Sequence, residues 1–435
     1  MCIFISPFRY SFNLFTLDYR TQDHLDTEIL NRIRDSYARA DPMNVDFGDC
    51  IKGTRENVIQ DIMDWVARTN SPRILWIRSM PGAGKSTIAR TIVRRLSQQN
   101  RHGAYFYFSR DDPSKQTPFA LWCHILYSLS CHFPVFKRTA AAHLRLHKFD
   151  FESLNTTDIS DAVIQTLSSL TESEISQNEM PIIVIDALDE CPKCSPLGAG
   201  LRQSVLDVIS KSSKLSSLFK IIVTSREDID IFKVLGNEET ADSIYLRTGV
   251  DVDEYSSRDI CHYIRERLAG KVEPSERDLE RLSRRAAGLF IWASMAVLFI
   301  LDKAGRARQR FERILNDESP GQLSDELSKL YHLLLTEEFS GNPDEAVRDA
   351  FQTVVGTLVV AATPLTRNEV FDLLIGTLEK GEVDEILKRI QMLISSSPSS
   401  SRAIRFSHQS FPEFLLQPKF RHQFYGIESG RSEAF

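Results

Sequence analysis

The sequence has few cysteines, no strong excess of one charge and no apolar run long enough to cross a membrane. Its 435 residues include seven cysteines and carry a formal net charge of −6. This charge gives no general attraction to nucleic acid or to an anionic membrane, so we expect neither partner. The longest apolar run, residues 286–301, is about one helical turn short of a bilayer span. We therefore expect a buried helix there and no transmembrane segment.

The cysteine spacing and the N-terminal sequence argue against several other classes of protein. Cys191 and Cys194 form a Cys-x-x-Cys pair, but no second pair lies at the spacing of zinc ligands. We expect a structural role for this pair and reduced thiols in a cytoplasmic protein. Residues 1–19 lack the basic start, continuous apolar core and cleavage site of a signal peptide. No repeat of about 20–50 residues is present, which argues against a solenoid or a propeller.

The chain is organised around a glycine loop between a predicted strand and a predicted helix. Residues 74–77 are an apolar run typical of a buried strand, and apolar side chains follow Thr87 at helical spacing. Glycines in the loop let the backbone aim N–H groups at an anion, and the helix adds its positive end. This context predicts a phosphate-binding loop. Its nucleotide-binding candidates are Pro81, Gly82, Ala83, Gly84, Lys85, Ser86 and Thr87.

Two side chains of this loop have predicted roles in binding a nucleotide. Lys85 can bridge the β- and γ-phosphates, and the Ser86 hydroxyl is the expected Mg²⁺ ligand. The usual pattern begins with a glycine where this chain has Ser79. The alternative interpretation is a glycine-lysine turn that opens an ordinary helix.

An acidic motif follows a second apolar strand, residues 181–186. Asp186 ends this strand, where a carboxylate can hold Mg²⁺ directly or through water. Asp189 or Glu190, on the next turn, can act as the general base for the attacking water. The alternative is a solvated acidic loop at the end of a strand.

Two further candidates lie nearer the C-terminus. Arg226 ends the apolar strand 219–226, where a guanidinium can sense the γ-phosphate. The alternative is an ordinary surface arginine at a strand end. His408 stands beside a serine turn, and taken alone it reads as a structural histidine.

Strands alternating with helices predict an α/β fold with a parallel sheet covered on both faces. Ligands in such sheets bind at the carboxyl ends of the strands. Lys85, Asp186 and Arg226 each follow a strand end, so we expect one site to gather them. Further strands are expected at 103–109 and 244–246, and helices at 25–39, 118–133 and 157–170. The C-terminal part is expected to be helical over 253–268, 277–301, 323–336, 344–360, 366–378 and 383–394, followed by a loop over 395–401, a strand over 403–407 and a helix over 410–416.

These patterns predict five segments. They are an N-terminal extension with one helix over 1–45, a nucleotide-binding domain over 46–249, a helical domain over 250–318, a winged-helix-like domain over 319–425 and a tail over 426–435.

The motifs resemble the NACHT class of STAND P-loop ATPases, and most closely fungal proteins with the nephrocystin-3-like N-terminal NTPase domain. The resemblance covers residues 46–420. It rests on residues 79–87, 182–190 and 221–226, with further similarity at 50–55, 106–110, 288–293 and 408–415.

The resemblance implies a nucleotide-binding domain, a helical domain and a winged helix that closes over bound ADP. Lys85, Ser86 and Thr87 then correspond to Walker A, Asp186 to Walker B and Arg226 to the sensor. His408 stands where the histidine of the family reaches the ADP β-phosphate. Phe290 stands where animal and plant relatives carry proline at the adenine side. The family adds an effector and sensor repeats, so we expect a partner protein to supply them here.

The sequence thus predicts an ATP/ADP-binding switch with slow Mg²⁺-dependent hydrolysis and self-association in the ATP state. The resemblance implies fungal non-self recognition or programmed-death-type signalling. The alternatives are a nucleotide-binding scaffold without turnover, a nucleic-acid-dependent P-loop ATPase and a small-molecule kinase.

Overall fold

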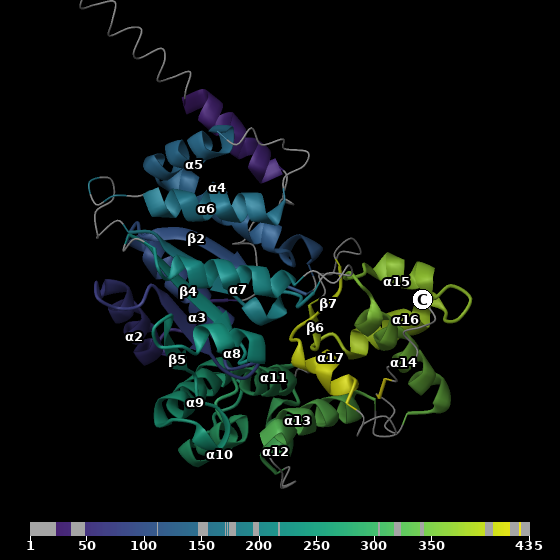
Figure 1. Ribbon diagram of the computed structural model, residues 1–435. Coiled ribbons are helices and arrows are strands. Elements are labelled where there is room, and N and C mark those ends of the chain that lie inside the picture. Colours follow the sequence, from purple (N-terminus) through teal and green to yellow (C-terminus); the bar gives the residue numbers. More distant parts are fainter. Residues whose placement is uncertain are drawn as a thin grey trace, which may run out of the picture. The chain divides into compact units, whose positions relative to one another are not determined.

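The computed structural model (Figure 1) contains two compact units, which we describe separately. The first unit takes in residues 1–48, 62–78 and 89–244, and the second takes in 49–61, 79–88 and 245–435. The structure describes residues 23–35, 48–110, 112–146, 155–169, 171, 173, 180–194, 200–215, 218–302, 305–316, 323–339, 343–395, 403–417 and 426–427. The predicted apolar start, the serine-rich loop after Ser395 and most of the tail lie outside these residues.

A five-stranded sheet forms the centre of the first unit. Its strands are β1 (Ile74–Arg78), β2 (His102–Tyr107), β3 (Ile182–Asp186), β4 (Lys220–Ser225) and β5 (Ala241–Tyr245). Their order is β2-β3-β4-β1-β5, and the β2–β3, β3–β4 and β1–β4 pairs are parallel. Every residue of β3 and β4 is buried, because helices cover both faces of a parallel sheet. The predicted α/β fold with a parallel sheet is therefore confirmed.

Helices surround this sheet. They are α2 (Glu56–Ala67), α3 (Lys85–Gln98), α4 (Pro118–His132), α5 (Pro134–Leu146), α6 (Thr156–Ser169), α7 (Leu201–Ser212) and α8 (Ile229–Leu235), with 3-10 turns η1 (Pro113–Lys115) and η3 (Leu188–Glu190). Figure 1 shows α4, α5 and α6 stacked beyond β2. The expected N-terminal helix is present over residues 23–35, where Asp26 pairs with Arg145 of α5. The sequence did not predict α5, α7 or α8.

A buried lysine ties β4 to the end of α2. Lys220 is fully buried, and its ammonium donates hydrogen bonds to the Trp65 and Arg68 carbonyl oxygens and to Ser71 Oγ. The last carbonyls of a helix have no partner within the helix, so a lysine there satisfies them. Burial, with nearby arginines adding to it, lowers the Lys220 pKa to about 8.

The second unit is mostly helical. It contains η4 (Gly249–Asp251), α9 (Glu254–Leu268), α10 (Glu276–Ala286), α11 (Phe290–Leu301), α12 (Ala307–Asn316), α13 (Leu323–Glu338), α14 (Glu345–Val360), α15 (Arg367–Leu373), α16 (Lys380–Arg389), β6 (Ile394–Ser395), β7 (Arg405–Phe406) and α17 (Ser410–Leu415). One apolar core runs from Ile260 to Ile427 through these elements. In Figure 1, α9 and α10 lie side by side within this unit. The part after α13 has the predicted order of three helices, a strand and a closing helix, with β6 and β7 paired antiparallel.

The single helix expected over residues 277–301 is wrong, since the chain breaks between α10 and α11. Ala287 and Gly288 have φ of +46° and +85°, in the left-handed region that interrupts a helix. A Cβ on Gly288 would lie 2.8 Å from the Arg247 carbonyl oxygen, so this close approach requires glycine. The expected buried helix is α11, which is apolar almost all round and only 12 residues long. Among the helices that the structure describes, none has the length and apolar character needed to cross a membrane.

Candidate functional site

The phosphate loop follows β1 directly and ends where α3 begins at Lys85. Gly82 and Gly84 have φ of +81° and +94°, so both use the freedom that glycine gives. The Lys85 ammonium donates to the Ser79 carbonyl oxygen (3.1 Å), to Ser79 Oγ (3.2 Å) and to the Met80 carbonyl oxygen (3.2 Å). Ser79 itself is buried and is not in the left-handed region. A serine is therefore sterically acceptable where the usual pattern has glycine.

Two hydrogen-bond donors from outside the loop bind its backbone carbonyl oxygens. The Ile291 N–H, in the first turn of α11, donates to the Gly82 carbonyl oxygen at 3.0 Å. Arg55 Nη2 donates to the Ala83 carbonyl oxygen at 2.9 Å. The guanidinium of Arg55 also lies 4.7 Å from the centre of the Phe290 ring. No individual role for Arg55 was expected from the sequence.

His408 lies close to this same loop. Its Cε1 lies 3.7 Å from the position that a Cβ on Gly82 would take. The Ser410 N–H donates to His408 Nδ1 (3.1 Å), and Ser410 Oγ lies 2.6 Å from that nitrogen. Because a backbone N–H can only donate, Nδ1 accepts, and the proton of the neutral ring is on Nε2. The Tyr331 hydroxyl, from α13, lies 2.8 Å from Ser410 Oγ and extends the chain of polar groups.

The first unit holds the acidic candidates at the carboxyl end of β3. Asp186 is buried, and its Oδ1 accepts a short hydrogen bond from the Thr224 hydroxyl. Thr224 Oγ1 also accepts the Ala187 N–H at 2.9 Å, and Ala187 has φ of +55°. The Tyr105 hydroxyl donates to the other oxygen, Asp186 Oδ2, at 3.4 Å. Carboxylate oxygens at the end of a buried strand are the kind of ligand that holds Mg²⁺ or its bound water, which fits the role expected for Asp186.

The two candidates for general base differ in their surroundings. Asp189 is engaged by Arg226, whose N–H donates to Oδ1 and whose Nε lies 3.1 Å from Oδ2. Glu190 accepts the Arg110 N–H at 3.2 Å. Burial, with the Asp189 charge adding to it, raises the Glu190 pKa to about 7. A general base works best with a pKa near the operating pH, so the raised pKa favours Glu190 for this role.

A buried arginine that the sequence analysis did not single out anchors this turn. Arg202 of α7 donates to the carbonyl oxygens of Asp189 (2.5 Å) and Cys191 (2.9 Å). It also pairs with Asp228 at 2.7 Å. Cys191 is buried, and burial raises the pKa of its thiol to about 12, which keeps it protonated and unreactive.

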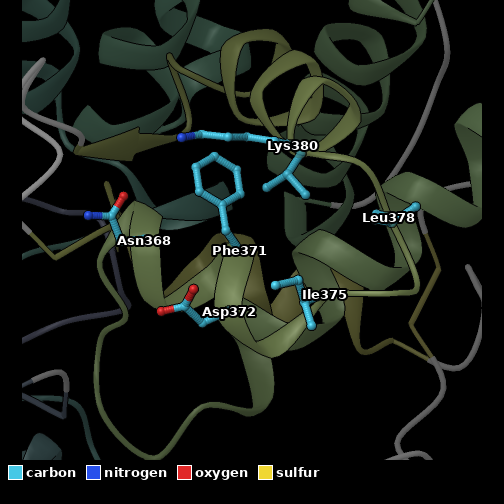
Figure 2. Close-up of a pocket in the computed structure, with 7 residues that line it drawn as sticks. Asn368, Phe371, Asp372, Ile375, Leu378 and Lys380 are labelled. Atoms are coloured by element: carbon cyan, nitrogen blue, oxygen red, sulfur yellow. The ribbon is translucent and has the colours of Figure 1, made fainter.

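A separate hollow of about 400 Å³ lies between α15 and the start of α16. Figure 2 shows Lys380 extended over the Phe371 ring, with Asp372 and Ile375 nearby. None of the predicted site residues lines it.

The predicted residues therefore gather in two groups. The loop residues 81–87 and His408 are in the second unit, where the His408 ring lies near Gly82. Asp186, Asp189, Glu190 and Arg226 are in the first unit, around the carboxyl ends of β3 and β4.

A parallel sheet whose β1 leads into a glycine-rich phosphate loop, with a buried aspartate ending β3, defines a P-loop NTPase. Residues 53–226 match the family model described as Nephrocystin 3, N-terminal. The predicted resemblance to the NACHT/STAND class of P-loop NTPases is confirmed over these residues, which include the phosphate loop, Asp186 and Arg226.

A curated protein and two solved structures show what the chain is similar to. Vegetative incompatibility protein HET-E-1 of Podospora anserina is 22% identical over 386 residues, which cover 84% of this chain and 27% of that protein. This chain thus spans about a quarter of that relative. The Walker-type ATPase of Pyrococcus abyssi has a TM-score of 0.41 at 13% identity, covering 85% of this chain and 98% of its own. A STAND protein of Pyrococcus horikoshii with a tetratricopeptide repeat sensor has a TM-score of 0.42 at 12% identity, covering 89% and 45%.

Proposed function

We propose that this chain is an ATP/ADP-dependent signalling switch that resets by slow Mg²⁺-dependent ATP hydrolysis. The position of His408 close to the phosphate loop carries this proposal. With its proton on Nε2, His408 is a hydrogen-bond donor beside Gly82, where a diphosphate held by the loop would accept it. A hydrogen bond from His408 to the diphosphate would thus couple the position of α17 to the nucleotide bound by the loop.

The remaining roles follow from the chemistry of each side chain. Lys85 and the N-terminus of α3 bind phosphate, and Thr87 belongs to the same helix terminus. Ser86 and Asp186 would hold Mg²⁺, which supplies charge neutralisation at the transferred phosphate. Glu190 takes the proton of the attacking water, and Arg226 orients Asp189 and senses the γ-phosphate.

In this proposal ADP stabilises a closed monomer through His408, and exchange for ATP releases α17 and permits self-association. A nucleotide can shift the two states only by its different affinities for them, and the β-phosphate bond to His408 provides this difference. By similarity to HET-E-1, we place the switch in fungal non-self recognition or programmed-death-type signalling, with a partner protein as sensor or effector.

The first test is the nucleotide that the purified protein carries. The protein is denatured and the supernatant is run on ion-exchange chromatography, for the wild type, Lys85→Ala and the matched control Lys388→Ala, an exposed lysine of α16. We expect stoichiometric ADP in the wild type and the control, and none in Lys85→Ala. A wild type that is empty and also fails to bind added ATP contradicts the proposal.

The second test separates a switch from a scaffold that binds nucleotide without turnover. Molar mass is measured by light scattering after size exclusion, with ADP and with a non-hydrolysable ATP analogue. We expect a monomer with ADP and a larger species with the analogue. One mass in both cases, together with no phosphate release from ATP, would support the scaffold.

A further inference from the structure

Two successive peptide groups of the phosphate loop have their carbonyl oxygens bound by donors outside the loop. The Gly82 carbonyl accepts the Ile291 N–H, and the Ala83 carbonyl accepts Arg55 Nη2. The first amides of a helix have no partner within it, so the Ile291 N–H is available for this bond. Phe290 precedes Ile291 and stacks against the Arg55 guanidinium, which places the two donors side by side.

These bonds determine where the next amides point. In a trans peptide the C=O and the N–H point in opposite directions, and the described part of the chain has no cis peptide. Holding the Gly82 carbonyl therefore directs the Ala83 N–H the opposite way. Holding the Ala83 carbonyl does the same for the Gly84 N–H. Successive N–H groups that turn inward form the concavity that binds an anion.

Arg55 is held in place by several contacts at an energetic cost. It is 3% exposed, its φ of +59° is unusual for a side chain of this size, and its buried Nε has no hydrogen-bond partner. Its N–H donates to Asp259 at 2.9 Å, and its Nη1 donates to Ser256 Oγ at 2.7 Å, both on α9. A residue keeps an unfavourable backbone conformation of this kind only where several surrounding contacts hold it there, and such residues cluster at functional sites.

We propose that Arg55 and the first turn of α11 form a donor clamp that orients the phosphate-loop amides, so that nucleotide affinity depends on the docking of α9 and α11 against the loop. Arg55 is a positioning residue in this clamp, and the inference rests on the proposed nucleotide binding. Because coupling is reciprocal, bound nucleotide also stabilises the docked α11. The clamp would thus couple the presence of nucleotide in the loop to the docking of α9 and α11, independently of His408.

The clamp is tested in the full chain by equilibrium binding of fluorescent ADP. Arg55→Met removes the guanidinium donors to Ala83 and Ser256, and Arg55→Lys keeps the charge but lacks the fork that reaches both together. Ile291→Pro removes only a first-turn amide, which a helix tolerates, whereas Ile291→Ala keeps it. Arg265→Met, in a half-exposed pair with Glu276, is the matched control.

We expect Arg55→Met and Ile291→Pro each to weaken ADP binding about tenfold, with little further loss when they are combined. Arg265→Met and Ile291→Ala should bind within about twofold of the wild type. Circular dichroism and thermal unfolding check that each variant is folded.

Hydrogen exchange over residues 288–295 gives a readout that a merely structural role would not change. ADP should slow exchange there in the wild type and not in Arg55→Met. The clamp is overturned if folded Arg55→Met and Ile291→Pro bind ADP as tightly as the wild type. If Lys85→Ala then fails to bind ADP, the proposed nucleotide binding still stands. If the wild type itself does not bind ADP, the proposed function fails first.

Discussion

The Thr224 hydroxyl joins the carboxylate of Asp186 to the tight turn that follows it, and Thr224→Val tests this arrangement. Thr224 is fully buried, and valine has nearly the same shape but carries a methyl group in place of the hydroxyl. The substitution removes the donor to Asp186 Oδ1 and the acceptor of the Ala187 N–H. Leaving a buried polar group without its partner costs about 1–3 kcal/mol, so two such groups predict a loss of about 3 kcal/mol in the free energy of unfolding.

The assay follows urea unfolding of the first unit alone. The chain has four tryptophans, of which Trp65, Trp76 and Trp122 belong to the first unit and Trp292 to the second. In a Trp292→Phe background, tryptophan fluorescence reports the first unit. Thr224→Ser keeps the hydroxyl and loses one methyl group, so it should cost only about 1 kcal/mol. If Thr224→Val is as stable as Thr224→Ser, the hydroxyl contributes nothing and the bridging role is refuted.

Three further predictions concern Glu190 and Ser410. The Glu190 pKa is raised to about 7, so the rate of ATP hydrolysis should rise with pH through about 7 as the carboxyl loses its proton. The steady-state rate of Glu190→Gln should be low and independent of pH. Between pH 4.5, its ordinary pKa, and about pH 7, Glu190 keeps its proton only in the folded chain. The free energy of unfolding of the wild type should therefore fall as pH rises through this window, and that of Glu190→Gln should not. Urea titrations at each pH measure this difference. Ser410→Ala removes the hydroxyl between Tyr331 and His408 and should weaken ADP binding about fivefold. Ser410→Thr keeps a hydroxyl and should bind ADP as the wild type does. Equal affinities for the wild type and both variants would contradict the role of this hydroxyl.

Much of the α/β unit could be predicted from the sequence because its signals are local. Apolar runs such as residues 182–185 identify buried strands, and the glycines before Lys85 identify the loop. The helices α5, α7 and α8 were missed; α5 begins at Pro134, directly after the end of α4, and α8 has only seven residues. The break between α10 and α11 was missed because it depends on the approach of Gly288 to the Arg247 carbonyl, which lies far away in the sequence.

The sequence by itself determined which residue types could bind phosphate and metal, since a P-loop is a short contiguous motif. Only the tertiary structure decided how these side chains are held. Thr224 bridges to Asp186 across two strands, and Arg202 reaches the Asp189 carbonyl from α7. Arg55 contacts the loop from nearly thirty residues away in the chain, and His408 lies near the loop from more than three hundred residues away. Hydrogen bonds between such distant residues leave no periodic pattern, because their geometry exists only after the elements have packed.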